Sequence, residues 1–340
     1  MIQQVKDGKK IVASGKAVAG SEILLSVKSP KLWDTHNPYL YDLEVVLYNN
    51  GKETDRIKSY AAMRKVSAQR DKDGFMRFQL NNKDIFHFGP LDQGWWPDGL
   101  YTPPSDEAML YDVQKTKELG FNLIRKHIKV EPARWYTYCD RMGILVWQDM
   151  PSGDAYPKWE PFVYNGGEEV KRSAESDATY RKEWKEIIDC LYSVPSIGVW
   201  VPFNEAWGQF DTERMTQVVI DKVSPQSLVC CASGWNDAEI GDIKDSHSYP
   251  YPSCPIDQKR ACVNGEYGGI TLKVPGHIWP GGDFGYTTVE TPEDFTVMFN
   301  DLADKIKDHY YYGLNAAVYT QLSDVEIEKN GIYTYDRRIL

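Results

Sequence analysis

The sequence predicts an α/β protein in which a partial β-sandwich precedes a (β/α)8 barrel. Residues 1–66 contain short alternating runs and no helical period, which is typical of antiparallel strands. From about residue 75, short apolar runs alternate with amphipathic segments at helical spacing, which indicates a parallel sheet covered by helices. Eight apolar runs over about 250 residues suit eight β/α units. We therefore expect a sandwich domain at 1–66 and a barrel at 67–340.

The first domain is predicted to consist of three or four strands. Strand-like runs occur at Ile23–Val27, Leu40–Tyr48 and Arg56–Met63, and Asn49-Asn50-Gly51 separates the last two. Asn-Gly between two such runs is a strong hairpin signal. A complete sandwich has about seven strands, so we expect part of it to lie upstream of this sequence.

The barrel elements follow in order along the chain. A glycine ends each of the first two helices, at Gly120 and Gly143, as is common at helix C-termini. Helices are predicted at Glu107–Leu119, Pro132–Met142, Ala178–Tyr192, Thr212–Val223 and Pro292–Tyr310, and strands near residues 86, 123, 146, 199, 229, 246, 263 and 317. A doubly wound sheet is the alternative, but the chain lacks the Gly-rich phosphate-binding turns that such sheets usually carry.

Composition excludes several classes of function. The chain has 39 basic and 49 acidic side chains, a net charge of −10, which argues against binding to nucleic acid or anionic membranes. No apolar run approaches the ~18 residues of a membrane-spanning helix, and Met1–Lys10 has no apolar stretch typical of a signal peptide. The six cysteines form no zinc framework, although Cys254 and Cys262 could pair in an oxidising compartment.

Two glutamates follow predicted strands on opposite sides of the barrel. Glu205 comes after the fourth strand and Glu266 after the seventh. Catalytic groups of such barrels project from the carboxyl ends of strands, so the two carboxylates are expected to face each other. Glycoside hydrolysis needs such a pair, one protonated to assist the leaving oxygen and one ionised to attack carbon or activate water. The alternative is that each glutamate is a surface carboxylate or part of an ion pair.

The motifs around these glutamates resemble the two catalytic signatures of the family 2 glycoside hydrolases. These motifs are Asn204-Glu205-Ala206-Trp207-Gly208 and Gly265-Glu266-Tyr267-Gly268, and further segments at 38–43, 119–127, 139–144 and 330–337 match the family in order. The resemblance implies an immunoglobulin-like first domain and a retaining β-glycosidase, with Glu205 as the general acid/base and Glu266 as the nucleophile. It also implies that Asn204 binds the 2-hydroxyl of the sugar.

Other residues are candidates for substrate binding. Arg125 and His127 share one face of the second strand, where a cation would keep the nucleophile ionised, although a structural ion pair is the alternative. Tyr249 follows the sixth strand and could donate to the nucleophile. Aromatic and acidic side chains in loops after strands suit sugar stacking and hydroxyl binding, or else belong to the core. The candidates of this kind are Asp92, Trp207 and Trp279.

The chain also departs from the family pattern. The usual N-terminal sugar-binding domain is not found, the second strand lacks the Ser-His-Tyr-Pro run, and Tyr319-Thr320-Gln321 stands where a tryptophan is usual. These differences affect the identity of the sugar more than the mechanism. We expect no organic or redox cofactor, and no cluster of acidic and histidine residues argues for the metal sites of some relatives.

The leading prediction is therefore an exo-acting β-glycosidase with a carbohydrate substrate. The segments Pro151–Ser176 and Leu272–Thr288 are long enough to wall off one end of a cleft, which favours exo over endo action. An endo-glycanase of the same clan and a catalytically silent carbohydrate-binding protein are the alternatives. Enzymes of this class act on external or imported glycans, so we expect a periplasmic or secreted bacterial location.

Overall fold

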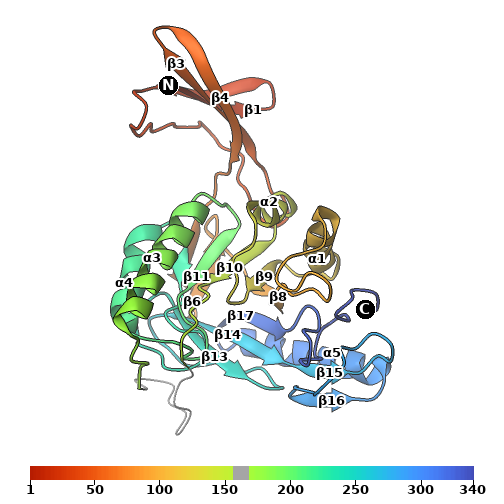
Figure 1. Cartoon of the computed structure of the whole chain (residues 1–340). Coiled ribbons are helices and arrows are strands. Elements are labelled where there is room, and N and C mark those ends of the chain that lie inside the picture. The colour runs from red at the N-terminus through yellow and green to blue at the C-terminus, as the bar shows by residue number, and fades with distance from the viewer. Residues whose placement is uncertain (156–167) are drawn as a thin grey trace.

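The protein contains an eight-stranded parallel barrel that is nearly closed, with an antiparallel sheet at one end (Figure 1). The computed structural model describes residues 1–155 and 168–340. The order β12-β11-β10-β9-β8-β17-β14-β13 follows the chain around the barrel, so the predicted (β/α)8 architecture is confirmed. The barrel strands are β8 (His87–Asp92), β9 (Leu123–Lys126), β10 (Leu145–Asp149), β11 (Ile197–Val201), β12 (Leu228–Val229), β13 (Ile243–Ser248), β14 (Ala261–Gly268) and β17 (Leu314–Thr320).

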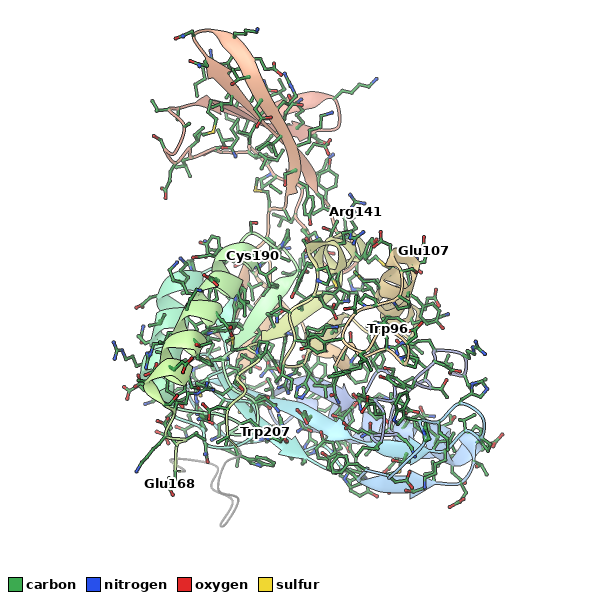
Figure 2. All side chains as sticks on the ribbon, viewed as in Figure 1. Trp96, Glu107, Arg141, Glu168, Cys190 and Trp207 are labelled. Carbon is green, nitrogen blue, oxygen red and sulfur yellow. The ribbon has the colours of Figure 1, made fainter. Side chains whose placement is uncertain are left out.

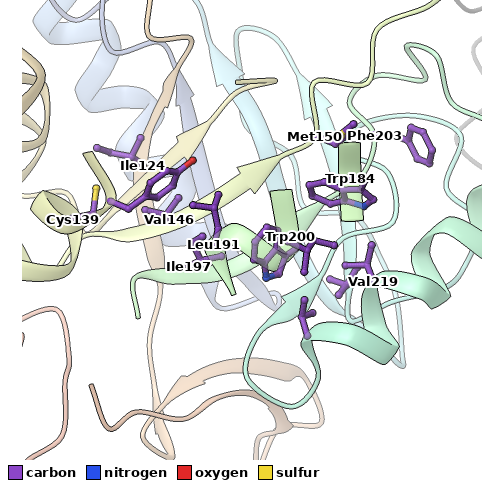
Figure 3. Packing of buried hydrophobic residues seen from close by; sticks show 14 of the residues in the cluster. Ile124, Cys139, Val146, Met150, Trp184, Leu191, Ile197, Trp200, Phe203 and Val219 are labelled. Atoms are coloured by element: carbon purple, nitrogen blue, oxygen red, sulfur yellow. The ribbon is translucent and has the colours of Figure 1, made fainter. Parts of the chain in front are cut away.

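Five helices cover the barrel in the part of the chain that the structure describes. They are α1 (Asp106–Glu118), α2 (Ala133–Met142), α3 (Ala174–Leu191), α4 (Thr212–Val223) and α5 (Pro292–Tyr310). The α3 helix begins four residues before its predicted start, because the Ser173 hydroxyl accepts a hydrogen bond from the Ser176 amide and caps the helix. No helix lies between β12 and β13 or between β13 and β14 among the described residues. Side chains of helices and strands, among them Trp184, Trp200 and Val219, pack in one buried hydrophobic cluster on one side of the barrel (Figure 3).

The barrel has a seam between β12 and β13, the two ends of the strand order. These strands form no ladder with each other in the described chain. Their neighbourhood is joined by one antiparallel bridge between Cys230 and Gly241 and by a hydrogen bond from the Asp242 amide to the Val229 carbonyl. The seam therefore depends more on side chains than the other strand contacts do.

The first part of the chain forms one antiparallel sheet of four strands. Its order is β2-β1-β3-β4, with β1 (Ile2–Asp7), β2 (Lys10–Lys16), β3 (Tyr41–Asn49) and β4 (Lys52–Ala61). The predicted β3–β4 hairpin is confirmed, and Asn50 and Gly51 both adopt positive φ in its turn. The predicted strand at Ile23–Val27 is wrong. That segment joins no sheet, and the Leu24 side chain is 96% exposed.

A junction sheet joins the four-stranded sheet to the barrel. It consists of β5 (Val66–Arg70), β6 (Met76–Leu80) and β7 (Lys83–Asp84), and Phe78 of β6 packs in the same buried cluster as Leu123 and Leu145 of the barrel. Fully buried Trp33 donates a 2.7 Å hydrogen bond to the Asp140 carbonyl of α2. We retain the division into 1–66 and 67–340 as a proposal, since β5 begins at the boundary itself.

Three further observations complete the description of the fold. A two-stranded sheet of β15 (Ile270–Leu272) and β16 (Thr287–Val289) lies beside α5. None of the helices in the described ranges is long and apolar enough to cross a membrane. Cys254 and Cys262, which could have paired, are both free thiols in the structure.

Candidate active site

A cavity of about 830 Å³ lies at the carboxyl ends of the barrel strands. Trp207, one of its lining residues, lies on the side of the molecule away from the four-stranded sheet (Figure 2). The lining combines acidic and aromatic side chains, which suits a hydroxyl-rich ligand with apolar ring faces. Among the lining residues are Gln93, Trp95, His127, Asn204, Glu205, Trp207, Glu266, Phe284, Tyr286 and Glu328.

Glu205 lies in the turn after β11 and reaches into this cavity. Its amide donates to the Ser233 carbonyl at 2.8 Å, and both Glu205 and Ala206 have positive φ angles of 49° and 60°. Residues other than glycine rarely adopt this conformation, and it is common at functional sites. Oε1 of Glu205 lies 2.8 Å from Nδ1 of His247. Burial raises the pKa of the Glu205 carboxyl, which favours the protonated form that a general acid needs.

Glu266 lies on β14, directly across the cavity from Glu205. The register of β14 against β17 shifts between Asn264 and Tyr267, which is typical of a strand that redirects a side chain. Oε1 of Glu266 accepts from the Arg125 guanidinium at 3.2 Å, and Oε2 accepts from the Tyr249 phenol at 2.5 Å. A cation and a phenol proton on its two oxygens stabilise a carboxylate, which is the form that a nucleophile needs.

The two carboxyl groups are close together. One carboxyl oxygen of Glu205, one of Glu266 and one ring nitrogen of His247 all lie within 4.8 Å of one another. Carboxyl pairs about 5–5.5 Å apart accompany retention in glycosidases, whereas inversion needs about 6.5–9.5 Å to admit a water molecule. The spacing therefore fits direct attack by one carboxylate.

Arg125 is fully buried beneath the two glutamates and has no proton left for a ligand. Its guanidinium donates to Asp149 twice, at 3.2 and 2.9 Å, to the Gly265 carbonyl at 3.0 Å and to Glu266. It also donates to Oδ1 of Asn204 at 2.7 Å, which fixes the orientation of that amide. These bonds use all five N–H groups, so Arg125 positions the site rather than a charged substrate.

Three of the seven predicted substrate-binding residues, Asn204, His127 and Trp207, line the cavity, and Arg125 and Tyr249 contact Glu266. Nδ1 of His127 lies 3.4 Å from Oδ2 of Asp149. The Tyr249 ring stacks on Tyr286, with centroids 3.5 Å apart and an interplanar angle of 2°. Residues 156–167 of the predicted wall at Pro151–Ser176 lie outside the described residues.

Two predicted residues lie elsewhere. Asp92 is buried at the end of β8 and accepts a 2.6 Å hydrogen bond from Lys126, so it belongs to an internal ion pair. The indole ring of Trp279 packs edge-on against Tyr335, with centroids 5.6 Å apart, and does not line the cavity.

Sequence reasoning missed several residues that meet at the site. His247 lies between the two glutamates, and its other ring nitrogen, Nε2, is 2.8 Å from the Ser233 hydroxyl. Ser233 in turn donates to Asp245. A signal was present, because Asp245 and His247 are two residues apart on β13 and strand residues with that spacing point the same way.

A metal ion is one alternative use of the Glu205, His247 and Glu266 atoms. The Arg125 guanidinium already supplies the positive charge beside Glu266, and His247 Nδ1 and Glu205 Oε1 are at hydrogen-bond distance from each other. This chemistry suits a shared proton better than a bound cation.

Comparison with known proteins confirms the resemblance seen in the motifs. The sequence model of glycosyl hydrolases family 2 matches residues 2–64. The chain is 28% identical over 217 residues to a β-glucuronidase of Bacteroides fragilis, covering 59% of this chain and 28% of that protein. It is 30% identical over 215 residues to β-mannosidase B of Aspergillus clavatus, covering 59% of this chain and 23% of that protein.

The barrel architecture has counterparts among solved structures. The crystal structure of an FMN-binding β-glucuronidase from Facaelibacterium prausnitzii L2-6 superposes with a TM-score of 0.77 at 19% identity, covering 99% of this chain and 54% of that chain. At this identity the likeness shows the fold alone. The chain spans less than a third of the two curated relatives and about half of this structure.

Proposed function

We propose that this chain, a relative of the family 2 glycosyl hydrolases, is a retaining β-glycosidase that removes terminal β-linked sugars. The observation that carries the proposal is the pair of close carboxyl groups in different environments. Glu205 is partly buried beside a histidine, whereas buried Glu266 accepts from Arg125 and Tyr249. This difference supports an acid and a nucleophile rather than two equivalent carboxylates.

The reaction takes place in two displacements. The Glu266 carboxylate attacks the anomeric carbon while the carbon–oxygen bond to the aglycone breaks, and the Glu205 proton moves to the departing oxygen. The alcohol leaves, and the sugar remains as an ester of Glu266. Glu205 then takes a proton from water as the water oxygen attacks the anomeric carbon. The sugar departs with its original configuration, and both carboxyl groups return to their starting forms.

Asn204 and the aromatic side chains bind the sugar in this proposal. Oδ1 of Asn204 is occupied by Arg125, so its amide nitrogen is left to donate to the 2-hydroxyl. Hydrogen bonds to this hydroxyl that strengthen in the transition state contribute to rate. Tyr286 and Trp207 supply flat faces in the cavity.

We infer that the sugar is uncharged. No lysine or arginine is among the described residues that line the cavity, whereas Glu326 and Glu328 are. Oε2 of Glu328 accepts from the Gln93 amide at 2.9 Å, which holds the carboxylate in place. A uronic acid would bring a further negative charge to a wall that already carries Glu326 and Glu328, without a lysine or arginine among the described lining residues to balance it. Neutral aryl β-glycosides are expected to exceed the matching β-glucuronide about 100-fold in kcat/KM, and a faster glucuronide would contradict the inference.

The retaining mechanism is tested by trapping. A panel of 2-deoxy-2-fluoro β-glycosides should add one sugar mass, and peptide mapping should find it on the peptide that carries Glu266. An adduct elsewhere contradicts the assignment of the nucleophile. Absence of an adduct and of turnover with every sugar would favour the silent carbohydrate-binding alternative, and cleavage within polymers would favour an endo-glycanase.

The acid role of Glu205 needs a separate test. Glu205→Ala should slow glycosides with poor leaving groups far more than activated aryl glycosides, because only the former need protonation. Equal losses for both would count against the acid role.

We also propose, from the class of substrate alone, a periplasmic or secreted location.

A further inference from the structure

We propose that Asp245, Ser233 and His247 form a hydrogen-bonded chain that holds Glu205 as the proton donor. The inference rests on the proposed function, because it assigns the support of that proposed acid. Asp245 Oδ2 lies 2.5 Å from Ser233 Oγ, Ser233 Oγ lies 2.8 Å from His247 Nε2, and His247 Nδ1 lies 2.8 Å from Glu205 Oε1. The three supporting side chains are all buried.

The donor and acceptor in each hydrogen bond can be assigned by starting at Asp245, the end of the hydrogen-bonded chain farthest from Glu205. Burial raises the pKa of the Asp245 carboxyl, and the donors around it oppose that effect. Its Oδ1 accepts from the Gly265 amide at 2.6 Å, and Ser233 Oγ donates to its Oδ2. Asp245 therefore takes the single Ser233 proton, and the Ser233 oxygen must accept. The donor to Ser233 is then the Nε2–H of His247. A neutral imidazole with its proton on Nε2 presents a lone pair at Nδ1.

The remaining partner of that lone pair is Glu205. A carboxylate at 2.8 Å would place two acceptors face to face, whereas a carboxylic acid donates to Nδ1. The hydrogen-bonded chain thus favours protonated Glu205, and in the first displacement this proton leaves the contact with Nδ1 and moves to the departing oxygen. Once Glu205 has protonated the leaving group, the same lone pair faces a carboxylate, which strengthens Glu205 as the base that takes a proton from water in the second displacement.

His247 stays neutral in this environment. Burial lowers the pKa of the imidazole, although Glu266 and Asp245 oppose the shift. The charged groups that face the ring are Glu266, whose Oε2 is 3.5 Å from Nδ1, Asp245, whose Oδ2 is 3.9 Å from Nε2, and Arg125, whose Nη1 is 3.5 Å from Nε2. His127 adds a weaker electrostatic effect. The Arg125 protons on that side are directed to Gly265 and Glu266 instead.

Two glycines leave room for the side chains of this hydrogen-bonded chain. Gly234 has a φ of +93°, and a Cβ there would lie 2.9 to 3.1 Å from the His247 ring. A Cβ on Gly265 would lie 2.1 Å from Asp245 Oδ2. Neither position tolerates a larger residue without displacing a member of the chain, so the backbone is shaped around these side chains.

The test uses three variants and one matched control. In His247→Ala, the basic limb of the pH profile of kcat/KM, which reports ionisation of the acid, should move down by about one pH unit. The loss in kcat should reach about 100-fold for alkyl glycosides and stay small for activated aryl glycosides. Ser233→Ala should give the same pattern more weakly, and Ser233→Thr should restore it. Ser246→Ala, on the same strand with its hydroxyl 3.0 Å from Ser253, should leave the profile unchanged.

A direct titration separates this inference from the proposed function. The carboxyl signal of Glu205, identified by its loss in Glu205→Gln, can be followed against pH by carbon-13 NMR with labelled glutamate. We expect its titration to shift by about tenfold in dissociation constant in His247→Ala, whether or not a substrate is known. An unchanged titration, an unchanged basic limb, or equal losses for good and poor leaving groups would overturn the proposal. If His247→Ala does not fold, the comparison of Ser233→Ala with Ser233→Thr decides.

Discussion

The Tyr249 hydroxyl donates a 2.5 Å hydrogen bond to Oε2 of Glu266 and lies 2.9 Å from the Thr320 hydroxyl. This contact holds one oxygen of the proposed nucleophile while Arg125 holds the other. The phenol cannot rotate freely, because its ring is stacked on Tyr286. In the proposed mechanism, a donor fixed in this way stabilises the Glu266 carboxylate before attack and again when its ester breaks.

Tyr249→Phe should therefore lower kcat without unfolding the protein. We expect a loss of about 100-fold, the size of effect typical of removing one positioned donor in an active site. The variant keeps the ring and its stacking partner. Steady-state kinetics on an aryl glycoside measure the effect, with Tyr251→Phe, whose side chain is half exposed, as the control. A Tyr249→Phe enzyme with the parent kcat would show that the phenol has no part in the reaction.

Arg125→Met should destabilise the fold as well as abolish activity. The substitution leaves Asp149 and Glu266 buried without their cation, which typically costs about 3–5 kcal/mol in the free energy of unfolding. Equilibrium urea unfolding measures this cost. Arg134→Met removes an exposed ion pair with Asp106 and should change the free energy by less than about 1 kcal/mol. Similar costs for the two variants would contradict the role assigned to Arg125.

Asp324→Asn should stabilise the protein increasingly as the pH rises. Burial raises the pKa of Asp324 to about 7, so between about pH 4 and pH 7 the folded protein holds a proton that the unfolded chain has lost. Stability therefore falls with rising pH through this window, by up to about 4 kcal/mol. Asparagine stays neutral and can still accept from the Gly331 amide, which donates at 2.8 Å.

Thermal unfolding at pH 5 and pH 8 checks this prediction. The gain of Asp324→Asn over the parent should be larger at pH 8, and exposed Asp73→Asn should show no such difference. A gain that is independent of pH would mean that the Asp324 carboxyl is not protonated in the native state.

Trp33→Ala should lower stability while sparing catalysis. The indole ring is fully buried between the four-stranded sheet and the barrel, and its loss is expected to cost about 3–5 kcal/mol. The active-site cavity lies away from this junction, so kcat at 25 °C should be unchanged. Leu24→Ala, at an exposed position in the same part of the chain, is the control for thermal unfolding. A large loss of kcat in folded Trp33→Ala would show that the junction influences the site.

The barrel could be predicted because its strands are distinctive. Ile144–Gln148 and Ile197–Phe203 are almost wholly apolar, and each is followed or preceded by a helix with a clear cap. The strands Ile2–Asp7 and Lys10–Lys16 escaped prediction, because exposed faces carry lysine and glutamine and the alternation is weak. Ile23–Val27 was predicted as a strand because it is apolar, but the segment pairs with no neighbouring strand in the structure.

The site was predictable at the ends of strands and less so beyond them. Glu205 and Glu266 could be found because motif and strand position coincide. Asp92 also ends a strand, but its carboxylate points inward and accepts from Lys126. Its position in the sequence does not reveal this direction. His247 went unnoticed because its importance comes from Ser233 and Asp245, which meet it only in three dimensions.

The contacts of Ser233 with Asp245 and His247 cross the seam of the barrel between β12 and β13. Ser233 follows β12, whereas Asp245 and His247 lie on β13, so the chain that supports Glu205 spans the place where the strand ladder is missing. Segments with few backbone hydrogen bonds open at a lower free energy than the rest of a fold. Amide protons along this line should exchange with solvent sooner than those of β9 or β10. Each such opening would separate Glu205, the proposed acid, from its support while the remaining strands stay paired. If the proposed function holds, warming should therefore cause a reversible loss of activity below the melting temperature.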